Sequence, residues 1–147
     1  MERDLQFERF LKHPPERVWK ALTDPRYLAS WYMDNDFEPV VGHRFQFHTD
    51  PGPGFDGVIY CEVIAVDEPH RLAYRFRAGA NMQDTIVTWT LTPQADGTLL
   101  RLDHTGFRGL QNIITSFILQ YGWWGFLRGL PATLAAIQEV ETDPISD

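Results

Sequence analysis

RLAYRFRAGANMQDTIVTWTLT, residues 71–92, contains the two clearest strand patterns of the sequence. In each half, apolar residues alternate with arginines or threonines, and this period of two indicates a strand with one covered and one solvated face. The residues expected on the covered face are Leu72, Tyr74, Phe76, Val87, Trp89 and Leu91. Because only a short break around residues 79–81 separates the two halves, we expect them to pair as an antiparallel hairpin.

Three more runs of strand character flank this hairpin: Val40–Thr49, Val58–Asp67 and Thr98–Gly106. Breaks rich in Pro, Gly and Asp separate them, as is typical of an antiparallel meander. Alternation places Phe45 and Phe47 on the covered face, together with Leu100, Leu102 and His104. In Val58–Asp67 the alternation does not resolve, so either both faces are covered or a bulge shifts the phase.

The element that covers the sheet must come from the C-terminal region. The apolar residues that recur there at spacings of four and three, typical of a core-facing helix, are Trp123, Leu127, Leu130, Leu134 and Ile137. We expect this helix to begin between Leu110 and Gly122 and to end near Val140. Pro131 within it predicts a kink or a local break.

The N-terminal segment predicts a strand over Asp4–Lys12 and then two short helices. Pro15 suits the first turn of one helix, and Asp24 can end it and cap a second one that contains Leu28 and Trp31. The sequence thus predicts an α+β fold, in which a curved antiparallel sheet of about six strands wraps around a long C-terminal helix. We expect a single domain over residues 1–147, with a frayed tail at 141–147.

The composition excludes several classes of function. The 147 residues are 44% hydrophobic, and the net charge of −7 disfavours binding to nucleic acid. No apolar run is long enough for a membrane span, and one lone cysteine, Cys61, suits the cytoplasm. The five histidines lack metal-ligand spacing, so we expect neither a metal nor a cofactor. Nothing in the pattern gives the oligomeric state.

Three segments of the sequence carry recognisable motifs. Pro15–Pro25 reads PERVWKALTDP and leads to Trp31. Glu62-Val63 is followed by PHRL at residues 69–72, and Gly122-Trp123 is followed by Leu127 and Leu130. In this order they are similar to the opening, central and closing motifs of the activator of heat shock protein 90 ATPase homologue family, which belongs to the START-like (SRPBCC) superfamily with its helix-grip fold. Together the segments span nearly the whole chain.

The resemblance implies three alternative functions. Members of the superfamily typically bind small apolar molecules between sheet and helix, and we therefore expect a small hydrophobic or aromatic ligand. Some members, such as aromatic polyketide cyclases, carry out chemistry there, so a cyclase, dehydratase or hydrolase is the second alternative. The third is a protein-interaction module with a chaperone partner, which an exposed apolar patch around Ile113, Ile114, Phe117 and Ile118 would favour.

The candidate site follows from the side chains expected to face inward. As ligand-lining residues we predict Trp31, Phe45, Phe47, Tyr60, Tyr74, Phe76, Trp89, His104, Trp123, Leu127 and Leu130. A neutral imidazole at His104 can exchange hydrogen bonds with a ligand or move a proton, although a buried histidine satisfied by the protein is the alternative. The catalytic alternative uses His104 with Tyr74 or Glu62 as acid and base; Glu62 and Tyr60 join the site only if their strand phase is inward.

Overall fold

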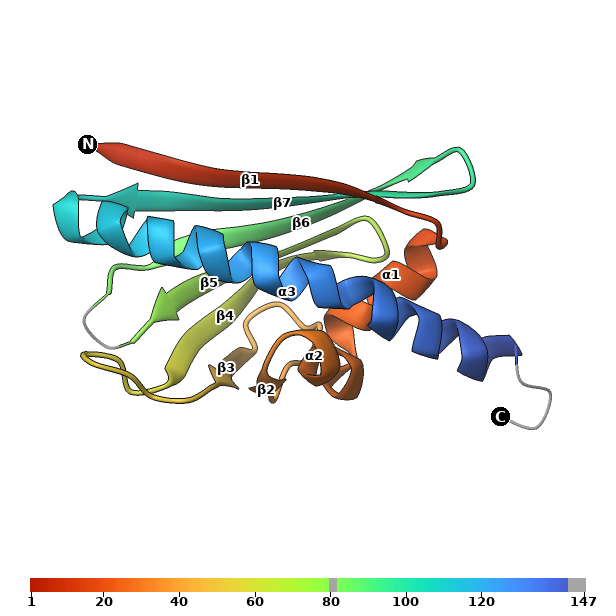
Figure 1. Ribbon diagram of the computed structural model, residues 1–147, viewed down its shortest axis with the longest axis horizontal. Helices are drawn as coiled ribbons and strands as arrows, with labels where there is room; N and C mark the ends of the chain where they lie inside the picture. The colour runs from red at the N-terminus through yellow and green to blue at the C-terminus, as the bar shows by residue number, and fades with distance from the viewer. Residues whose placement is uncertain (80–81, 143–147) are drawn as a thin grey trace.

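The structure is a computed structural model that describes residues 1–79 and 82–142. Within these residues it contains seven strands and three helices (Figure 1). The strands are β1 (Glu2–Leu11), β2 (Asp34–Asn35), β3 (Arg44–His48), β4 (Val58–Asp67), β5 (Arg71–Ala78), β6 (Thr85–Gln94) and β7 (Gly97–Arg108). The helices are α1 (Pro15–Thr23), α2 (Pro25–Trp31) and α3 (Leu110–Thr142).

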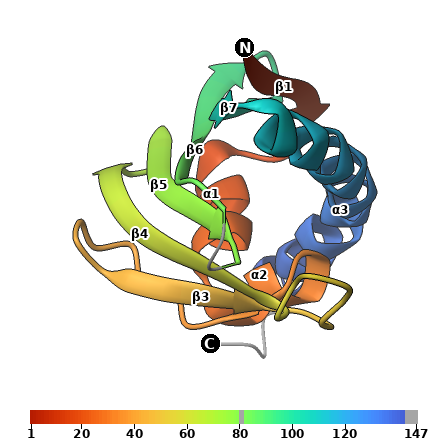
Figure 2. The same ribbon diagram turned by 90° about the vertical axis from the view of Figure 1, so that its left-hand side faces the viewer.

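The strands form one antiparallel sheet in the order β1-β7-β6-β5-β4-β3-β2. The predicted meander is therefore confirmed from β3 to β7, and β1 returns to pair with β7. Viewed end-on, the sheet is an open arc, and α3 lies across its gap (Figure 2). This is the expected helix-grip arrangement of a curved sheet around a long C-terminal helix.

The two short helices cover one end of the arc, at the far side in Figure 2. Pro15 occupies the first turn of α1, and the Asp24 side chain accepts a hydrogen bond from the backbone N–H of Arg26, which caps α2. Trp31 at the end of α2 donates from its indole nitrogen to the carbonyl of Ala21, 2.8 Å away. The helix pair thus closes this end of the interior and leaves the opposite end to loops.

The sheet differs from the prediction at two places. It has seven strands because the two-residue β2 pairs with β3, and so short a strand leaves no alternation to read. The first strand of the meander begins at Arg44 instead of Val40, because Gly42 adopts a φ of +91° in a turn and leaves Val40 58% exposed. The predicted break at residues 79–81 lies mostly outside the described residues.

The unresolved phase of β4 is explained by a bulge. Register with β5 shifts between Val63 and Ala65. Before the shift, Ile59, Cys61 and Val63 are buried on the inner face. The bulge alternative is therefore the right one, and the side chains of Tyr60 and Glu62 lie on the outer face.

The helix α3 begins at Leu110, the earliest residue of the predicted range, and is continuous through Pro131. Glu141 and Thr142 of the predicted tail belong to this helix, and residues 143–147 lie outside the described part of the chain. The predicted stripe from Trp123 to Ile137 is buried throughout. No helix among the described residues combines the length and the apolar character needed to cross a membrane.

Candidate ligand-binding site

The centre of the space between the sheet and α3 is filled by aromatic side chains. The ring centroid of Trp89 on β6 lies 6.0 Å from that of Trp31 and 5.6 Å from that of Trp123, edge to face in both cases. Phe45 on β3 lies 5.3 Å from Tyr74 on β5 in the same manner. Because these are contact distances for aromatic pairs, the rings leave no room between them for a ligand.

Most predicted ligand-lining residues belong to this filled centre, which we call the aromatic core. They are Trp31, Phe45, Phe47, Tyr74, Phe76, Trp89, His104, Trp123, Leu127 and Leu130, all of them buried. The structure brings these residues together as the sequence predicts. It does so by packing them against one another, and none of them lines the cavity of about 620 Å³ at the open end of the arc.

His104 is fully buried and has both ring nitrogens in hydrogen bonds. The indole N–H of Trp123 donates to Nδ1 over 3.1 Å. Because an indole can only donate, Nδ1 carries the lone pair and the ring proton is on Nε2. Nε2 then donates to the hydroxyl of Thr85, 2.7 Å away, and that hydroxyl donates to the carbonyl of Phe76 over 2.8 Å.

This chain of bonds makes His104 a structural residue. Burial lowers its pKa to about 3, so the ring is neutral at physiological pH. The rings of Phe76, Phe107 and Trp123 surround it, and it has no exposed surface. The alternative of a buried histidine satisfied by the protein therefore describes its environment.

The two tyrosines of the interior each contact a tryptophan of the aromatic core. Tyr74 accepts a hydrogen bond from the indole of Trp89 over 3.2 Å, and burial raises its pKa. Tyr32 stacks on Trp123 at a centroid distance of 5.0 Å with an interplanar angle of 2°. Sequence reasoning did not single out Tyr32, because it follows the last turn of α2 and falls outside the spacing of Leu28 and Trp31.

Tyr60 and Glu62 lie on the outer face of the sheet, which corrects the prediction for Tyr60. The Tyr60 hydroxyl donates to the Asp56 carboxylate over 3.1 Å. Glu62 forms an ion pair with Arg44 at 3.4 Å. The proposed catalytic set of His104, Tyr74 and Glu62 is thus not brought together, since the first two lie in the aromatic core and the third on the opposite side of the sheet.

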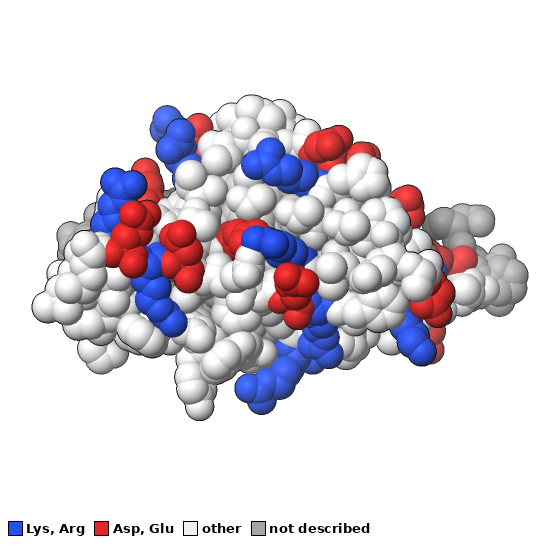
Figure 3. Space-filling view, turned by 90° about the horizontal axis from the view of Figure 1, so that it is seen from above, with Lys and Arg blue, Asp and Glu red and all other residues white. Residues whose placement is uncertain are grey.

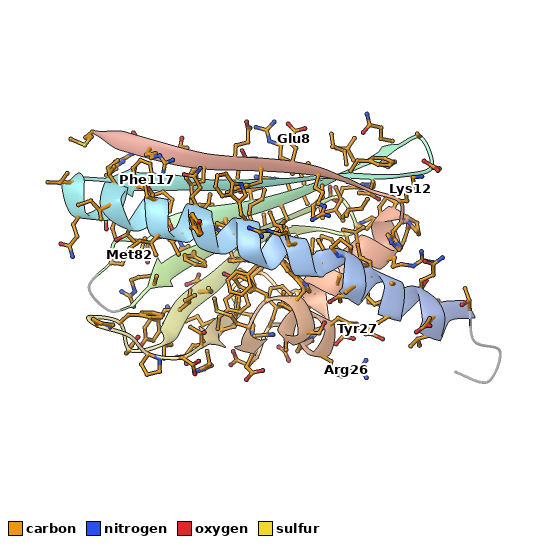
Figure 4. All side chains as sticks on the ribbon, viewed as in Figure 1. Glu8, Lys12, Arg26, Tyr27, Met82 and Phe117 are labelled. Carbon is orange, nitrogen blue, oxygen red and sulfur yellow. The ribbon has the colours of Figure 1, made fainter. Side chains whose placement is uncertain are left out.

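A cavity of about 620 Å³ lies at the open end of the arc, beside the aromatic core. The first turns of α3, the β3–β4 loop and the facing ends of β4 and β5 surround it. Its apolar lining consists of Met33, Pro53, Phe55, Ile59, Ala78, Met82, Ile118 and Leu119. Met82 lies at the end of the molecule where α3 begins (Figure 4). We call this space the end cavity.

Polar groups stand along one side of the end cavity. Asn112 donates to the side-chain oxygen of Gln83 over 3.2 Å and to the carbonyl of Arg108 over 2.8 Å. The Thr115 hydroxyl donates to the carbonyl of the preceding helical turn. Gln111 also lines the space. Amide and hydroxyl groups on α3 can therefore orient a bound molecule from one side, while the apolar lining receives the remainder.

Asp56 is the acidic group in the lining of the end cavity. Its carboxylate accepts from the backbone N–H of Val58 over 3.1 Å and from the Tyr60 hydroxyl. Within residues 1–79 and 82–142 no cluster of three His, Cys, Asp or Glu side chains is arranged to hold a metal ion. Cys61 is buried, and burial raises the pKa of its thiol, which keeps it protonated.

A second hollow, of about 560 Å³, lies on the outer face of the sheet. Its charged lining has both signs: Asp36, Arg44, Glu62, Arg75, Arg77 and Asp84. Arg44 is already paired with Glu62, and the guanidinium of Arg77 lies 5.3 Å from the ring centre of Tyr60. The charges of this hollow compensate one another, and the end cavity is the better candidate for an organic ligand.

The sequence contains one signal for the end cavity that alternation does not use. Phe55 and Met82 are large apolar residues in segments otherwise rich in Gly, Pro, Asp and Asn. An apolar side chain in such a loop indicates that the loop covers something apolar. Both side chains pack against the core from the open end.

Comparison with known proteins places the chain in a family. The family model described as activator of Hsp90 ATPase homolog 1-like protein matches residues 12–135. The crystal structure of protein MLL2253 from Mesorhizobium loti is 37% identical, has a TM-score of 0.83, and the match covers 96% of this chain and 99% of that one. No curated protein matches the chain.

Two more distant structures share the fold. CalU16 from Micromonospora echinospora is 22% identical with a TM-score of 0.74, over 90% of this chain and 76% of that one. DynU16, a protein in the dynemicin biosynthetic locus, is 26% identical with a TM-score of 0.72, over 95% of this chain and 47% of that one. The resemblance inferred from the three motifs is confirmed: the chain belongs to the activator of Hsp90 ATPase homolog 1-like family.

Proposed function

We propose that the chain binds a small apolar molecule in the end cavity. One observation carries this proposal: the aromatic core is packed, whereas a cavity of about 620 Å³ with an apolar lining stands beside it. Ligand sites in proteins commonly measure about 300–1,000 Å³ and are mostly apolar with a few placed polar groups. The end cavity has this size and this composition.

The lining describes the class of ligand. Met33, Met82 and Phe55 present flexible or flat apolar surfaces that adapt to a ring system or a branched chain. Gln111 and Asn112 can bond to one or two polar atoms at the rim. Because Asp56 supplies negative charge and no lysine or arginine lines the cavity among the described residues, a neutral molecule is favoured over an anion.

Binding is favoured over the enzymatic alternative by the placement of titratable groups. A cyclase, dehydratase or hydrolase needs at least one acid or base that reaches the substrate. In the described lining of the end cavity Asp56 is the one such group, and it accepts two hydrogen bonds from its own loop and the adjoining strand.

The expected compartment for this binding function is the cytoplasm.

A titration with N-phenyl-1-naphthylamine, a neutral apolar fluorescent probe, tests the proposal. The variant Ala78→Phe adds a ring to the wall of the end cavity, where Ala78 is half-buried. We expect the probe's emission to increase on binding to the wild-type protein and to saturate near one probe molecule per chain. The variant should bind the probe at least about tenfold more weakly, a loss of about 1.4 kcal/mol of binding free energy.

Ala136→Phe is the matched control, because Ala136 is exposed on α3 and does not line the cavity. Its affinity for the probe should equal that of the wild type. If Ala78→Phe, folded by circular dichroism, binds the probe as well as the control does, the end cavity is not the binding site. Mass spectrometry of small molecules extracted from the purified protein would then identify the natural ligand class.

A further inference from the structure

A second apolar stripe runs along the solvent side of α3, opposite the stripe that packs on the aromatic core. Its members share high exposure and spacings of three and four: Leu110, Ile114, Phe117, Ile118, Tyr121 and Trp124. Leu110 is 66% exposed, Tyr121 75% and Trp124 47%. We call this set the outer stripe.

The outer stripe has the periodicity of a helix–helix seam. The series Leu110, Ile114, Phe117, Tyr121 and Trp124 advances by four, three, four and three residues. That is the 3.5-residue period with which one helix packs along another. Since a helix that is apolar on both faces is ordinarily buried on both, the outer stripe indicates a missing partner.

We infer that this partner is a second copy of the chain, packed α3 against α3 across a twofold axis. The charge distribution supports it. Residues 110–127 contain no Asp, Glu, Lys or Arg, although the whole chain carries a net charge of −7. The neighbouring face over β1 carries charges of both signs (Figure 3). Two copies of like net charge repel one another least where an uncharged face meets an uncharged face.

The outer stripe is large for an exposed apolar patch. Aromatic side chains bury about 150–250 Å² each, so at their exposures Phe117, Tyr121 and Trp124 alone offer roughly 270–450 Å², to which Leu110, Ile114 and Ile118 add. A standard interface takes about 800 Å² from each partner, whereas the largest apolar patch on a monomer is about 300–600 Å².

The residue sizes fit an antiparallel pairing centred between Phe117 and Ile118. In that register Ile114 faces the Tyr121 of the other copy, and Leu110 faces its Gly125. A side chain built on Gly125 would meet nothing within 4 Å, so there is space for the exposed Leu110 to enter. At one edge of the outer stripe, the Arg3 guanidinium covers the Phe117 ring at 3.7 Å and bonds to Ser116 and Gln120.

A lipid surface is the less suitable occupant. Helices that lie on membranes carry lysine and arginine on their polar face to bind anionic lipids. Residues 110–127 offer none, and Arg3, the basic side chain that reaches the outer stripe, is held against Phe117, Ser116 and Gln120.

Sedimentation velocity over a concentration series tests the inference. We expect a species of twice the 17.0 kDa chain for the wild type. The double variant Ile114→Glu with Tyr121→Glu places charges on two exposed positions and should sediment as a monomer, while retaining the probe binding of the end cavity, which neither residue lines. Ala136→Glu, on the same helix outside the stripe, should remain dimeric.

Cysteine cross-linking tests the register. With a mild oxidant, Ile118→Cys should cross-link to its own copy, because position 118 lies next to the twofold axis. Leu110→Cys should not, because the two copies of residue 110 lie about 22 Å apart along antiparallel helices at about 1.5 Å per residue. The native Cys61 is buried and should remain unreacted.

Three results would overturn the inference. A wild type that stays monomeric at the highest attainable concentration removes the dimer. A double variant that still dimerises moves the interface elsewhere. A monomeric wild type that instead co-sediments with phosphatidylcholine vesicles, or with a purified chaperone, assigns the outer stripe to that occupant.

Discussion

His104 links three parts of the molecule through one neutral ring. It accepts a hydrogen bond from Trp123 on α3 and donates one to Thr85 on β6. The Thr85 hydroxyl in turn donates to the backbone carbonyl of Phe76 on β5. Protonation would place a second N–H against the indole N–H of Trp123, so it is unfavourable in the folded state. The ring therefore joins helix to sheet only while it is neutral.

The free energy of unfolding should consequently decrease as the pH is lowered, in a window set by the pKa of His104. Its pKa is about 3 in the folded state and about 6.5 when the chain is unfolded, so between these values the unfolded state binds more protons. Stability due to this residue is complete above the unfolded pKa and is lost as pH falls toward 3, with a slope approaching about 1.4 kcal/mol per pH unit. Guanidinium unfolding at about pH 7 and pH 5 measures it.

His104→Gln is the comparison variant, because it cannot titrate. We expect it to be less stable at neutral pH by about 1–3 kcal/mol, since it disturbs two buried hydrogen bonds. Its stability should change less between the two pH values than that of the wild type. His13, whose pKa burial also lowers, is present in both proteins and cancels in the difference. Equal pH dependences would contradict the assignment of the neutral ring to a structural role.

Which face each aromatic residue occupies was predictable from the sequence, but what lies between the residues was not. Period-two alternation placed Phe45, Tyr74 and Trp89 on the covered face, where the structure has them. Alternation indicates only the face of the sheet toward which each side chain points, and it contains no information on whether the rings are in contact. The face that Tyr60 occupies could not be read from the sequence, because a bulge that lies further along the strand makes both phases of β4 look apolar.

At the scale of elements, a side chain of β1 bonds to the carbonyl that Pro131 leaves free in α3. Pro131 has no N–H, which deprives the carbonyl of Leu127 of its partner within the helix. The guanidinium of Arg9 donates to that carbonyl over 2.7 Å. The predicted kink or break does not interrupt the helix, and the freed carbonyl instead ties α3 to the edge strand β1.

A double-mutant cycle measures this contact. Arg9→Met keeps the apolar stem and removes the donor, and we expect a loss of about 1–3 kcal/mol of stability in urea unfolding because a part-buried carbonyl loses a charged partner. In the Pro131→Ala background the loss should be smaller, since alanine at this position supplies the N–H that the Leu127 carbonyl lacks. Lys12→Met, an exposed change on the same segment, should cost little.

Equal costs of Arg9→Met in the two backgrounds would show that Arg9 acts independently of Pro131. The sequence alone could not reveal their relation, because the two residues are far apart in the chain and belong to elements whose relative placement only the fold provides. The helix itself was predictable, since its buried stripe from Trp123 to Ile137 follows the expected spacing.

At the scale of the whole molecule, binding is expected at one end of the arc. The helices α1 and α2 cover one end, the aromatic core fills the middle, and the loops of the other end leave the cavity. The curved sheet and its covering helix could be predicted because strands and helices have a period. Loops have none, and although Phe55 and Met82 indicate that their loops cover something apolar, the cavity that they line could only be recognised in the structure.

Methyl NMR tests the central claim, that the end cavity binds and the aromatic core does not open. Titration of isoleucine-, leucine- and methionine-labelled protein with N-phenyl-1-naphthylamine should shift the methyl signals of Met33, Ile59, Met82 and Leu119, which line the cavity. The methyl signals of Leu130, a buried residue of α3 in the aromatic core, should stay unchanged. A shift at Leu130 with none at Met82 or Leu119 would contradict the account.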